Sequence, residues 1–224
     1  MNNTFGENKN YILYRTVYDL LHPTISRKNI TNYKIVLQDD LVPIRVFYPS
    51  KETRLEKIVI YIHGEDSDYE QLCKDLALNT DSLVLAVDYQ DNPLEECLAV
   101  ITYLLKNNKE IEKDKISLIG DGLGADLILT LTLEHKVKIK KQVLFYPLLK
   151  EIKEPDTKIV PDTLFFTAEL DPNIKSQILY FDELKKRNNE SLYFNIENAP
   201  YGFFNNSLNF KRENCFEIIK KFIN

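Results

Sequence analysis

The sequence predicts an α/β fold in which a mainly parallel sheet of about eight strands carries helices on both faces. Short runs rich in β-branched and aromatic residues alternate with segments of helical spacing along most of the chain. One such run, residues 57–62, is typical of a strand that is buried on both faces of a parallel sheet. Glycine is scarce, at 6 of 224 residues, yet three of the six lie within residues 120–124, where a predicted strand meets a predicted helix.

In chain order, the pattern predicts an N-terminal helical segment at residues 1–30 and a core at residues 31–224, together one domain. The core opens with an antiparallel hairpin of two strands, 33–37 and 44–48. Further strands are expected at 57–62, 83–87, 116–119, 142–146, 163–167 and 191–196. Helices are expected at 11–21, 69–79, 93–105, 125–134, 174–186 and around 216–223, where apolar residues recur at helical spacing.

Composition excludes several classes of function. The formal net charge of −5 argues against a protein that coats nucleic acid or an anionic membrane, because both need a dense positive surface. The longest apolar runs, such as residues 58–62 and 83–87, are too short to cross a bilayer, and the first ten residues lack the apolar centre of a signal peptide. We therefore expect a cytoplasmic protein with no nucleic-acid or membrane partner.

The three cysteines are Cys73, Cys97 and Cys215, an odd number without a Cys-x-x-Cys pair. This spacing favours neither a disulfide framework nor a zinc site. We expect the cysteines to be buried as small hydrophobic residues, and we expect no metal and no cofactor.

The sharpest local motif is the segment 116–125, Ile-Ser-Leu-Ile-Gly-Asp-Gly-Leu-Gly-Ala. A strand that stops at Gly-x-x-x-Gly and passes directly into a helix has the pattern of a nucleophile elbow, where the middle residue of G-x-S-x-G is the attacking serine. Here the middle residue is Gly122, which has no side chain. The alternative is a phosphate-binding turn, but the motif follows several strands and has no Lys-Ser/Thr pair after it.

Further segments resemble those of one known family, and they occur in the same order. They are Val-Ile-Tyr-Ile-His-Gly at 59–64, a strand ending in Asp88-Tyr89, Gly-Asp-Gly-Leu-Gly-Ala at 120–125, the segments 143–147 and 161–172, and Asn-Ala-Pro-Tyr-Gly-Phe at 198–203. From about Lys34 to the C-terminus, the chain resembles the α/β-hydrolase fold, in the carboxylesterase branch similar to hormone-sensitive lipase. Because only residues 148–160 stand where that branch has a long insertion, we expect a reduced or absent cap domain.

The resemblance implies where a catalytic triad belongs. Gly122 stands at the nucleophile position, Asp171 at the acid position and Tyr201 where the family has its base histidine. The chain's three histidines, His22, His63 and His135, all precede Asp171, whereas this fold uses the order Ser, acid, His. A tyrosine with a pKa near 10 is a weak base at pH 7. For Asp171 a second interpretation is a carboxylate that caps a loop.

The resemblance also implies that His63, Gly64, Glu65 and Leu123 line the oxyanion loop and ligand pocket. The family's loop is His-Gly-Gly-Gly, but here Glu65 and Asp66 replace the last two glycines. Carboxylates that face the pocket would oppose the charge that develops during acyl transfer. The alternative, that both side chains point to water and only their backbone N–H groups face inward, stays open.

The sequence therefore predicts an esterase-like homologue that is catalytically impaired or inactive, a pseudoenzyme, which binds a small acyl or ester-like ligand or a protein partner. Two alternatives remain. The first is an active carboxylic-ester hydrolase with a non-standard nucleophile. Ser67 and Cys73 have no recognisable base, and an aspartyl mechanism would need a carboxylate at position 122 itself, whereas Asp121 precedes it. The second is a structural role, with homo-oligomerisation through the predicted edge strand Ser191 to Ile196.

Overall fold

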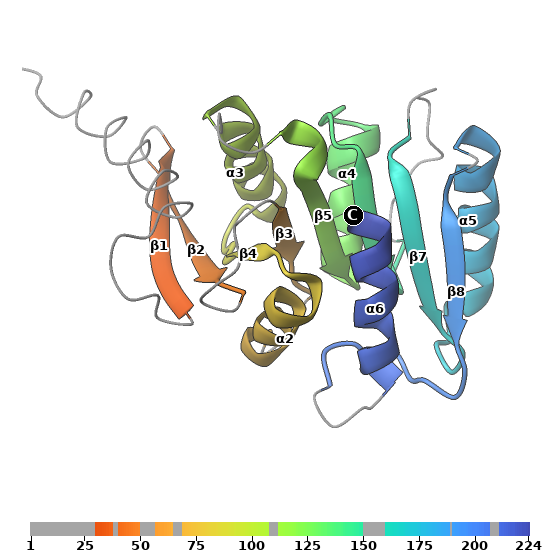
Figure 1. Ribbon diagram of the computed structural model, residues 1–224. Helices are drawn as coiled ribbons and strands as arrows, with labels where there is room; N and C mark the ends of the chain where they lie inside the picture. Colours follow the sequence, from red (N-terminus) through yellow and green to blue (C-terminus); the bar gives the residue numbers. More distant parts are fainter. Residues whose placement is uncertain are drawn as a thin grey trace, which may run out of the picture.

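The computed structural model describes residues 30–37, 40–49, 57–64, 69–107, 112–149, 160–188, 190–206 and 211–224. The predicted N-terminal helix at 11–21 and the loop residue Glu65 lie outside these ranges. Eight strands form one sheet in the order β1-β2-β4-β3-β5-β6-β7-β8 (Figure 1). The strands are Ile30–Leu37 (β1), Asp40–Phe47 (β2), Ile58–Ile62 (β3), Leu83–Val87 (β4), Ile116–Asp121 (β5), Lys141–Phe145 (β6), Asp162–Ala168 (β7) and Leu192–Ile196 (β8).

The sheet is antiparallel at one end and parallel elsewhere. Strand β1 pairs with β2, and β2 pairs with β4, in antiparallel register. Strands β4, β3, β5, β6, β7 and β8 are all mutually parallel, so their carboxyl ends meet at one edge of the sheet. Ligand sites of parallel sheets lie at this edge. The predicted fold class and opening hairpin are confirmed.

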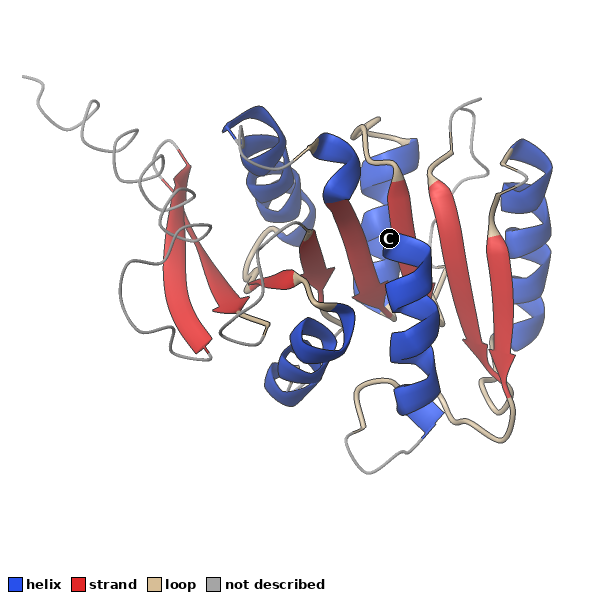
Figure 2. Cartoon of the chain, in the orientation of Figure 1, coloured by secondary structure: helices blue, strands red, loops and turns tan. Residues whose placement is uncertain are grey.

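Helices cover both faces of the sheet (Figure 2). They are Glu70–Thr80 (α2), Pro93–Asn107 (α3), Leu123–Leu133 (α4), Ile174–Arg187 (α5) and Lys211–Ile223 (α6), with a short 3₁₀ turn at Lys113–Lys115. Side chains alternate across each strand, so in β3 Ile58, Ile60 and Ile62 join the core under α3, α4 and α5, while Val59 and Tyr61 join the core under α2 and α6. The two cores are therefore separated by the sheet itself.

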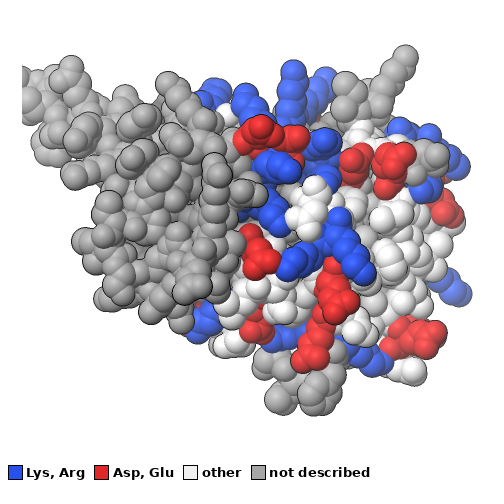
Figure 3. All heavy atoms as spheres, viewed as in Figure 1, with Lys and Arg blue, Asp and Glu red and all other residues white. Residues whose placement is uncertain are grey.

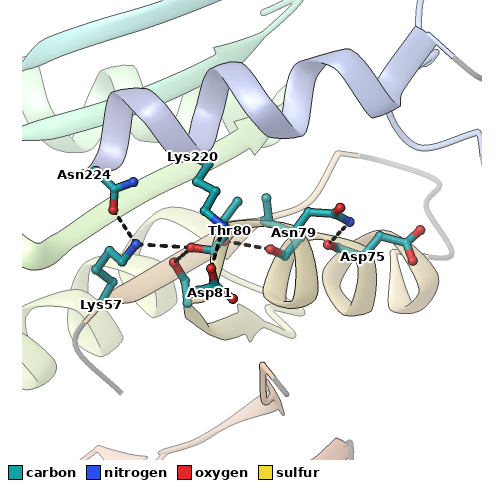
Figure 4. Close-up of polar contacts among 9 residues, drawn as sticks. Lys57, Asp75, Asn79, Thr80, Asp81, Lys220 and Asn224 are labelled. Atoms are coloured by element: carbon teal, nitrogen blue, oxygen red, sulfur yellow. Dashed lines mark hydrogen bonds and ion pairs between the residues drawn. The ribbon is translucent and has the colours of Figure 1, made fainter. Parts of the chain in front are cut away.

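Helices α2 and α6 are joined by polar contacts at their ends. Lys220 pairs with Asp81 at 2.5 Å, and Lys57 donates both to the Thr80 carbonyl oxygen, at 3.3 Å, and to Asn224 Oδ1 (Figure 4). Arg212 pairs with Asp75 near the other end of α6. These contacts hold α6 against α2, next to the turn that carries Tyr201.

The connection between β6 and β7 is residues 146–161. Residues 150–159 of this connection lie outside the described residues, so the reduced or absent cap stays a prediction. Among the described residues, no helix has the length and apolar character needed to cross a membrane.

Candidate functional site

The turn between β5 and α4 consists of a single residue, Gly122. Strand β5 ends at Asp121 and α4 begins at Leu123, two residues earlier than the sequence pattern predicts. Gly122 has φ 51° and ψ −118°, a backbone conformation that is open to glycine and strained for other residues. Its N–H group donates to the Phe145 carbonyl oxygen at 3.0 Å, which joins the turn to the neighbouring strand β6. This is the strained strand-to-helix geometry of a nucleophile elbow.

The glycines that flank the elbow allow the backbone segments to pack closely. A Cβ atom at Gly120 would lie 2.8 Å from the Gly124 carbonyl group, and a Cβ atom at Gly124 would overlap the carbonyl oxygen of Ile62. No other residue fits between the start of α4 and the end of β3. The elbow therefore sits directly beside the His63–Gly64 segment.

The side chain of Tyr201 fills the space above Gly122. A Cβ atom built at Gly122 would overlap the Tyr201 hydroxyl oxygen and lie 3.3 Å from Cζ of the same ring. The tyrosine is 43% exposed, so its other side faces solvent. The structure thus brings together the two residues that the resemblance assigns to the nucleophile and base positions, and the Tyr201 hydroxyl occupies the side-chain position of Gly122.

Tyr201 is carried by a turn that is anchored in the core. The following residues Phe203 and Phe204 are fully buried, and the Phe204 ring stacks on Phe145 with a centroid separation of 3.7 Å. Tyr146, also fully buried, packs edge-on against Tyr201 at 5.0 Å. The position of Tyr201 therefore follows from aromatic packing around the ends of β6 and β7.

Asp121, directly before the elbow, points into the protein. Its Oδ1 accepts hydrogen bonds from the Tyr61 hydroxyl at 2.6 Å and from the Gly64 N–H group at 3.1 Å. Burial raises the pKa of the Asp121 carboxyl above its usual value, and these two hydrogen bonds partly oppose the rise. Through the hydrogen bond from Gly64, the Asp121 carboxylate connects β5 to the segment that the resemblance assigns to the oxyanion loop. Tyr61 was not singled out by sequence reasoning, although it is the one hydroxyl in an otherwise aliphatic strand.

His63 is held by aromatic stacking. Its ring stacks on Tyr69 at 4.7 Å and on Tyr89 at 4.3 Å, and its Nδ1 lies 2.7 Å from the Gly64 carbonyl oxygen. A carbonyl oxygen only accepts, so this contact places a proton on Nδ1. The Tyr89 hydroxyl donates to the His63 carbonyl oxygen at 2.7 Å. Stacking and hydrogen bonds therefore hold His63 and Gly64 at the ends of β3 and β4.

Asp171, which the resemblance assigns to the acid position, accepts hydrogen bonds from Gln177 of α5 and from the residue before that helix. Its Oδ1 accepts from the Asn173 N–H group, and its Oδ2 accepts from Gln177 Nε2, each at 2.8 Å. Gln177 Nε2 also donates to the Pro147 carbonyl oxygen at 3.0 Å. The carboxylate is 2% exposed. These contacts fit the interpretation of Asp171 as a carboxylate that caps a loop. No sequence motif includes Gln177. Its role is recognised only from its hydrogen bonds to Asp171 and Pro147.

Leu123 is the first residue of α4 and is partly exposed. N–H groups in the first turn of a helix have no partner inside the helix, and the helix dipole favours negative charge there. The elbow therefore offers backbone donors next to the Tyr201 hydroxyl. Among the described residues, no group of three or more His, Cys, Asp or Glu side chains is placed to hold a metal ion.

The sequence is similar to known hydrolases. Residues 60–159 match the model of a family described as alpha/beta hydrolase fold. A mouse (Mus musculus) protein, arylacetamide deacetylase-like 4 family member 1, is 26% identical over 154 aligned positions, and the alignment covers 58% of this chain and 37% of that protein. Mouse neutral cholesterol ester hydrolase 1 is 26% identical over 50% of this chain and 34% of its own length. The aligned region thus spans little more than a third of these relatives.

An arylesterase of Saccharolobus solfataricus is 28% identical over 51% of this chain and 43% of its own length. Solved structures match a larger share of this chain than these sequence relatives do. An arylesterase structure matches with a TM-score of 0.76 and 21% identity, covering 99% of this chain and 92% of its own. Carboxyl esterase 2 of Tuber melanosporum matches with a TM-score of 0.74 and 19% identity over 89% of this chain and 88% of its own. This chain has the α/β-hydrolase fold, and its sequence resembles the carboxylesterase branch similar to hormone-sensitive lipase.

Proposed function

We propose that this chain does not hydrolyse esters by covalent catalysis, and that it holds a small acyl or ester-like ligand at the elbow without turning it over. The observation that carries the proposal is the placement of the Tyr201 hydroxyl where a side chain at position 122 would project. A serine in that place needs both free space and a base beside it. Here the residue has no side chain, and the space is occupied.

The chemistry of the two residues supports this proposal. Glycine supplies no atom that can attack a carbonyl carbon. Tyrosine is a weak base at neutral pH, so its hydroxyl group donates a hydrogen bond more readily than it removes a proton. Together with the N–H groups at the start of α4, it forms a set of donors suited to a carbonyl oxygen. Donors of this kind bind an ester or acid group without cleaving it.

Of the three candidate replacement nucleophiles, Ser67 lies outside the described residues, and the surroundings of Cys73 and Asp121 argue against both. Cys73 is fully buried, and burial raises the pKa of its thiol well above the ordinary value, so the thiolate is disfavoured. The Asp121 carboxylate is also buried and already accepts two hydrogen bonds. An aspartyl mechanism would need its carboxylate at position 122.

The proposal is tested with a fluorophosphonate probe, which labels activated serines, and with p-nitrophenyl acetate. We expect no labelling of the natural chain. The matched variant carries Gly122→Ser together with Tyr201→His, because the shorter histidine vacates the space that a serine needs. We expect labelling and increased ester hydrolysis in this double variant. Stoichiometric labelling of the natural chain would contradict the proposal.

Ligand binding is tested separately, by calorimetry with a short-chain methyl ketone as a non-hydrolysable carbonyl ligand. Removing one hydrogen bond by Tyr201→Phe is expected to cost about 1 kcal/mol of binding free energy. Tyr193→Phe, on the remote strand β8, is the control and should leave the affinity unchanged. Equal affinity in natural chain and Tyr201→Phe would remove the ligand part of the proposal.

A further inference from the structure

Tyr146, the residue that follows strand β6, combines two unfavourable features. Its side chain is fully buried, yet its hydroxyl group has no hydrogen-bond partner among the described residues. Its backbone has φ 35°, in the left-handed region that bulky residues rarely adopt. Pro147 comes next, and a residue before proline ordinarily prefers an extended backbone. Strain and unpaired buried polar groups of this kind are concentrated at functional sites.

Hydrogen bonds hold Tyr146 in this conformation. Its N–H group donates to the Phe166 carbonyl oxygen at 2.7 Å, and Gln177 Nε2 donates to the Pro147 carbonyl oxygen at 3.0 Å. The Tyr146 ring packs edge-on against Tyr201, with a centroid separation of 5.0 Å. The backbone therefore leaves the strand at this point with the side chain fixed beneath the tyrosine that covers the elbow.

The Tyr146 hydroxyl lies on the side of the elbow. The preceding residue, Phe145, accepts the hydrogen bond of the Gly122 N–H group at 3.0 Å. Burial raises the pKa of Tyr146 well above its ordinary value, and the neighbouring Asp121 and Tyr201 side chains, both next to Gly122, raise it further. The hydroxyl therefore stays protonated at neutral pH and acts as a hydrogen-bond donor.

The surroundings of this hydroxyl leave its proton without an acceptor. The N–H groups of Phe204 and Asn205 partly oppose the rise in the pKa of Tyr146, so they lie near its oxygen atom. An N–H group can only donate a hydrogen bond. The proton of the hydroxyl therefore remains for an acceptor that the described part of the chain does not supply. A carbonyl oxygen is an acceptor of this kind.

The distribution of charge favours a neutral ligand at the elbow. The Asp121 carboxylate is buried directly before Gly122, and among the described residues no lysine or arginine is one of the main influences on its pKa or on that of Tyr146. Figure 3 shows Lys and Arg side chains gathered around the C-terminal end of α6, near the amino end of β3, where Lys57 donates to Asn224. The elbow follows the carboxyl end of β5, at the opposite edge of the sheet. An anionic ligand there would be repelled by Asp121.

We propose that the Tyr146 hydroxyl is a binding group of the elbow site, which donates to the carbonyl oxygen of a neutral ligand, a ketone or an ester, and that the site selects such a ligand over a carboxylate. The inference rests on the ligand binding proposed above and adds to it a residue and a selectivity. Tyr201 covers Tyr146 on one side and is 43% exposed on the other. The ligand shifts the Tyr201 ring outward, which needs no unpacking of the core, and reaches both hydroxyl groups.

The first test measures the affinity of the full chain for methyl propyl ketone by calorimetry. Tyr146→Phe keeps the ring and removes the hydroxyl, and it should raise the dissociation constant about fivefold, which corresponds to about 1 kcal/mol. Tyr180→Phe is the matched control, because the Tyr180 hydroxyl is also buried without a partner among the described residues, but it packs against the core on the other face of the sheet. This variant should bind the ketone as the natural chain does.

Urea denaturation of the same two variants separates binding from a structural role. Removing a buried hydroxyl that has no partner should leave the midpoint of unfolding unchanged or raise it, in Tyr146→Phe as in Tyr180→Phe. We therefore expect Tyr146→Phe to lose affinity without losing stability. A midpoint that falls only in Tyr146→Phe would assign its hydroxyl to the support of the fold and would overturn the proposal.

The second test compares the ketone with butyrate, which has the same shape but carries a carboxylate. The natural chain should bind the ketone at least about tenfold more tightly at neutral pH, a difference of about 1.4 kcal/mol. Butyrate that binds as tightly as the ketone would overturn the selectivity. If the ketone binds and Tyr201→Phe weakens it while Tyr146→Phe does not, only the role of Tyr146 is wrong. A natural chain that does not bind the ketone would remove this inference together with the ligand part of the proposed function.

Discussion

The hydroxyl group of Tyr201 occupies the position into which a side chain at Gly122 would project. The two residues are therefore complementary, since the glycine makes room for the tyrosine and the tyrosine covers the glycine. A serine at position 122 alone would have to displace the ring, and a histidine at position 201 alone would face no nucleophile. Each of the two departures from the esterase pattern is consistent with the other.

This relationship predicts that a methyl group at position 122 lowers the free energy of unfolding. Gly122→Ala combines an unfavourable backbone conformation, φ 51°, with overlap against Tyr201, whereas Gly202→Ala has φ 79° but meets nothing within 4 Å. The backbone strain costs roughly 1–3 kcal/mol in each case. We expect Gly122→Ala to lower the free energy of unfolding by more than Gly202→Ala, as measured by urea denaturation.

A double-mutant cycle isolates the part due to Tyr201. In a Tyr201→Ala background the overlap is absent, so the cost of Gly122→Ala should fall to that of Gly202→Ala. The same cost in both backgrounds would mean that the exposed tyrosine ring moves aside without penalty. In that case the contact between Gly122 and Tyr201 would make no contribution to the free energy of unfolding.

Much of the fold follows from the sequence, because strand periodicity and glycine placement are local signals. The run at 57–62 predicts β3 to within one residue. The start of α4 was predicted at Ala125 and lies at Leu123 instead. The reason is that Gly122 alone makes the turn, which is possible only in a backbone conformation that glycine adopts readily.

The site was predictable only in part. Motif order assigns Gly122, Asp171 and Tyr201, by resemblance, to the nucleophile, acid and base positions of the family. It does not reveal what these residues contact. Asp171 accepts hydrogen bonds from Asn173 and from Gln177, a glutamine one helical turn further along. That partnership depends on how α5 packs against β7, and tertiary packing of this kind leaves no local pattern.

The Asp171–Gln177 contact predicts a stability effect. Gln177→Ala removes the donor shared by the Asp171 carboxylate and the Pro147 carbonyl oxygen, both within a buried region. Leaving a buried charged acceptor short of a donor costs about 1–3 kcal/mol. We expect a loss of that size in the free energy of unfolding, and a smaller loss for the exposed control Gln71→Ala, whose amide contacts Asp75 at the surface. Equal effects would show that water replaces the lost donor.

Burial of Asp121 predicts a dependence of stability on pH. Because its folded pKa is raised above the ordinary value of 3.8, the folded state binds more protons than the unfolded state between the two values. Its contribution is most favourable below about 3.8 and is lost as pH rises through the folded pKa. Asp121→Asn keeps the acceptor oxygen and removes this titration. The stability of Asp121→Asn relative to the natural chain should therefore increase as pH rises above 3.8, and a constant difference would contradict the assignment.

The contacts between α2 and α6 allow a matched comparison of a buried and an exposed ion pair. The Arg212 side chain is 8% exposed and pairs with Asp75, and within the described part of the chain its Nη1 has no hydrogen-bond partner. Lys220 and Asp81 are each 42% exposed. Removing the partner of a buried charge costs about 3–5 kcal/mol, whereas an exposed pair contributes at most about 1 kcal/mol.

We therefore expect Asp75→Ala to lower the free energy of unfolding several times more than Asp81→Ala does, in urea denaturation at neutral pH. Raising the salt concentration should reduce the small effect of Asp81→Ala, because exposed charges are screened, and should leave the effect of Asp75→Ala nearly unchanged. Comparable losses for the two variants would mean that the Arg212 guanidinium finds water or another acceptor when Asp75 is removed. The buried pair would then hold α6 in place no more firmly than the exposed one.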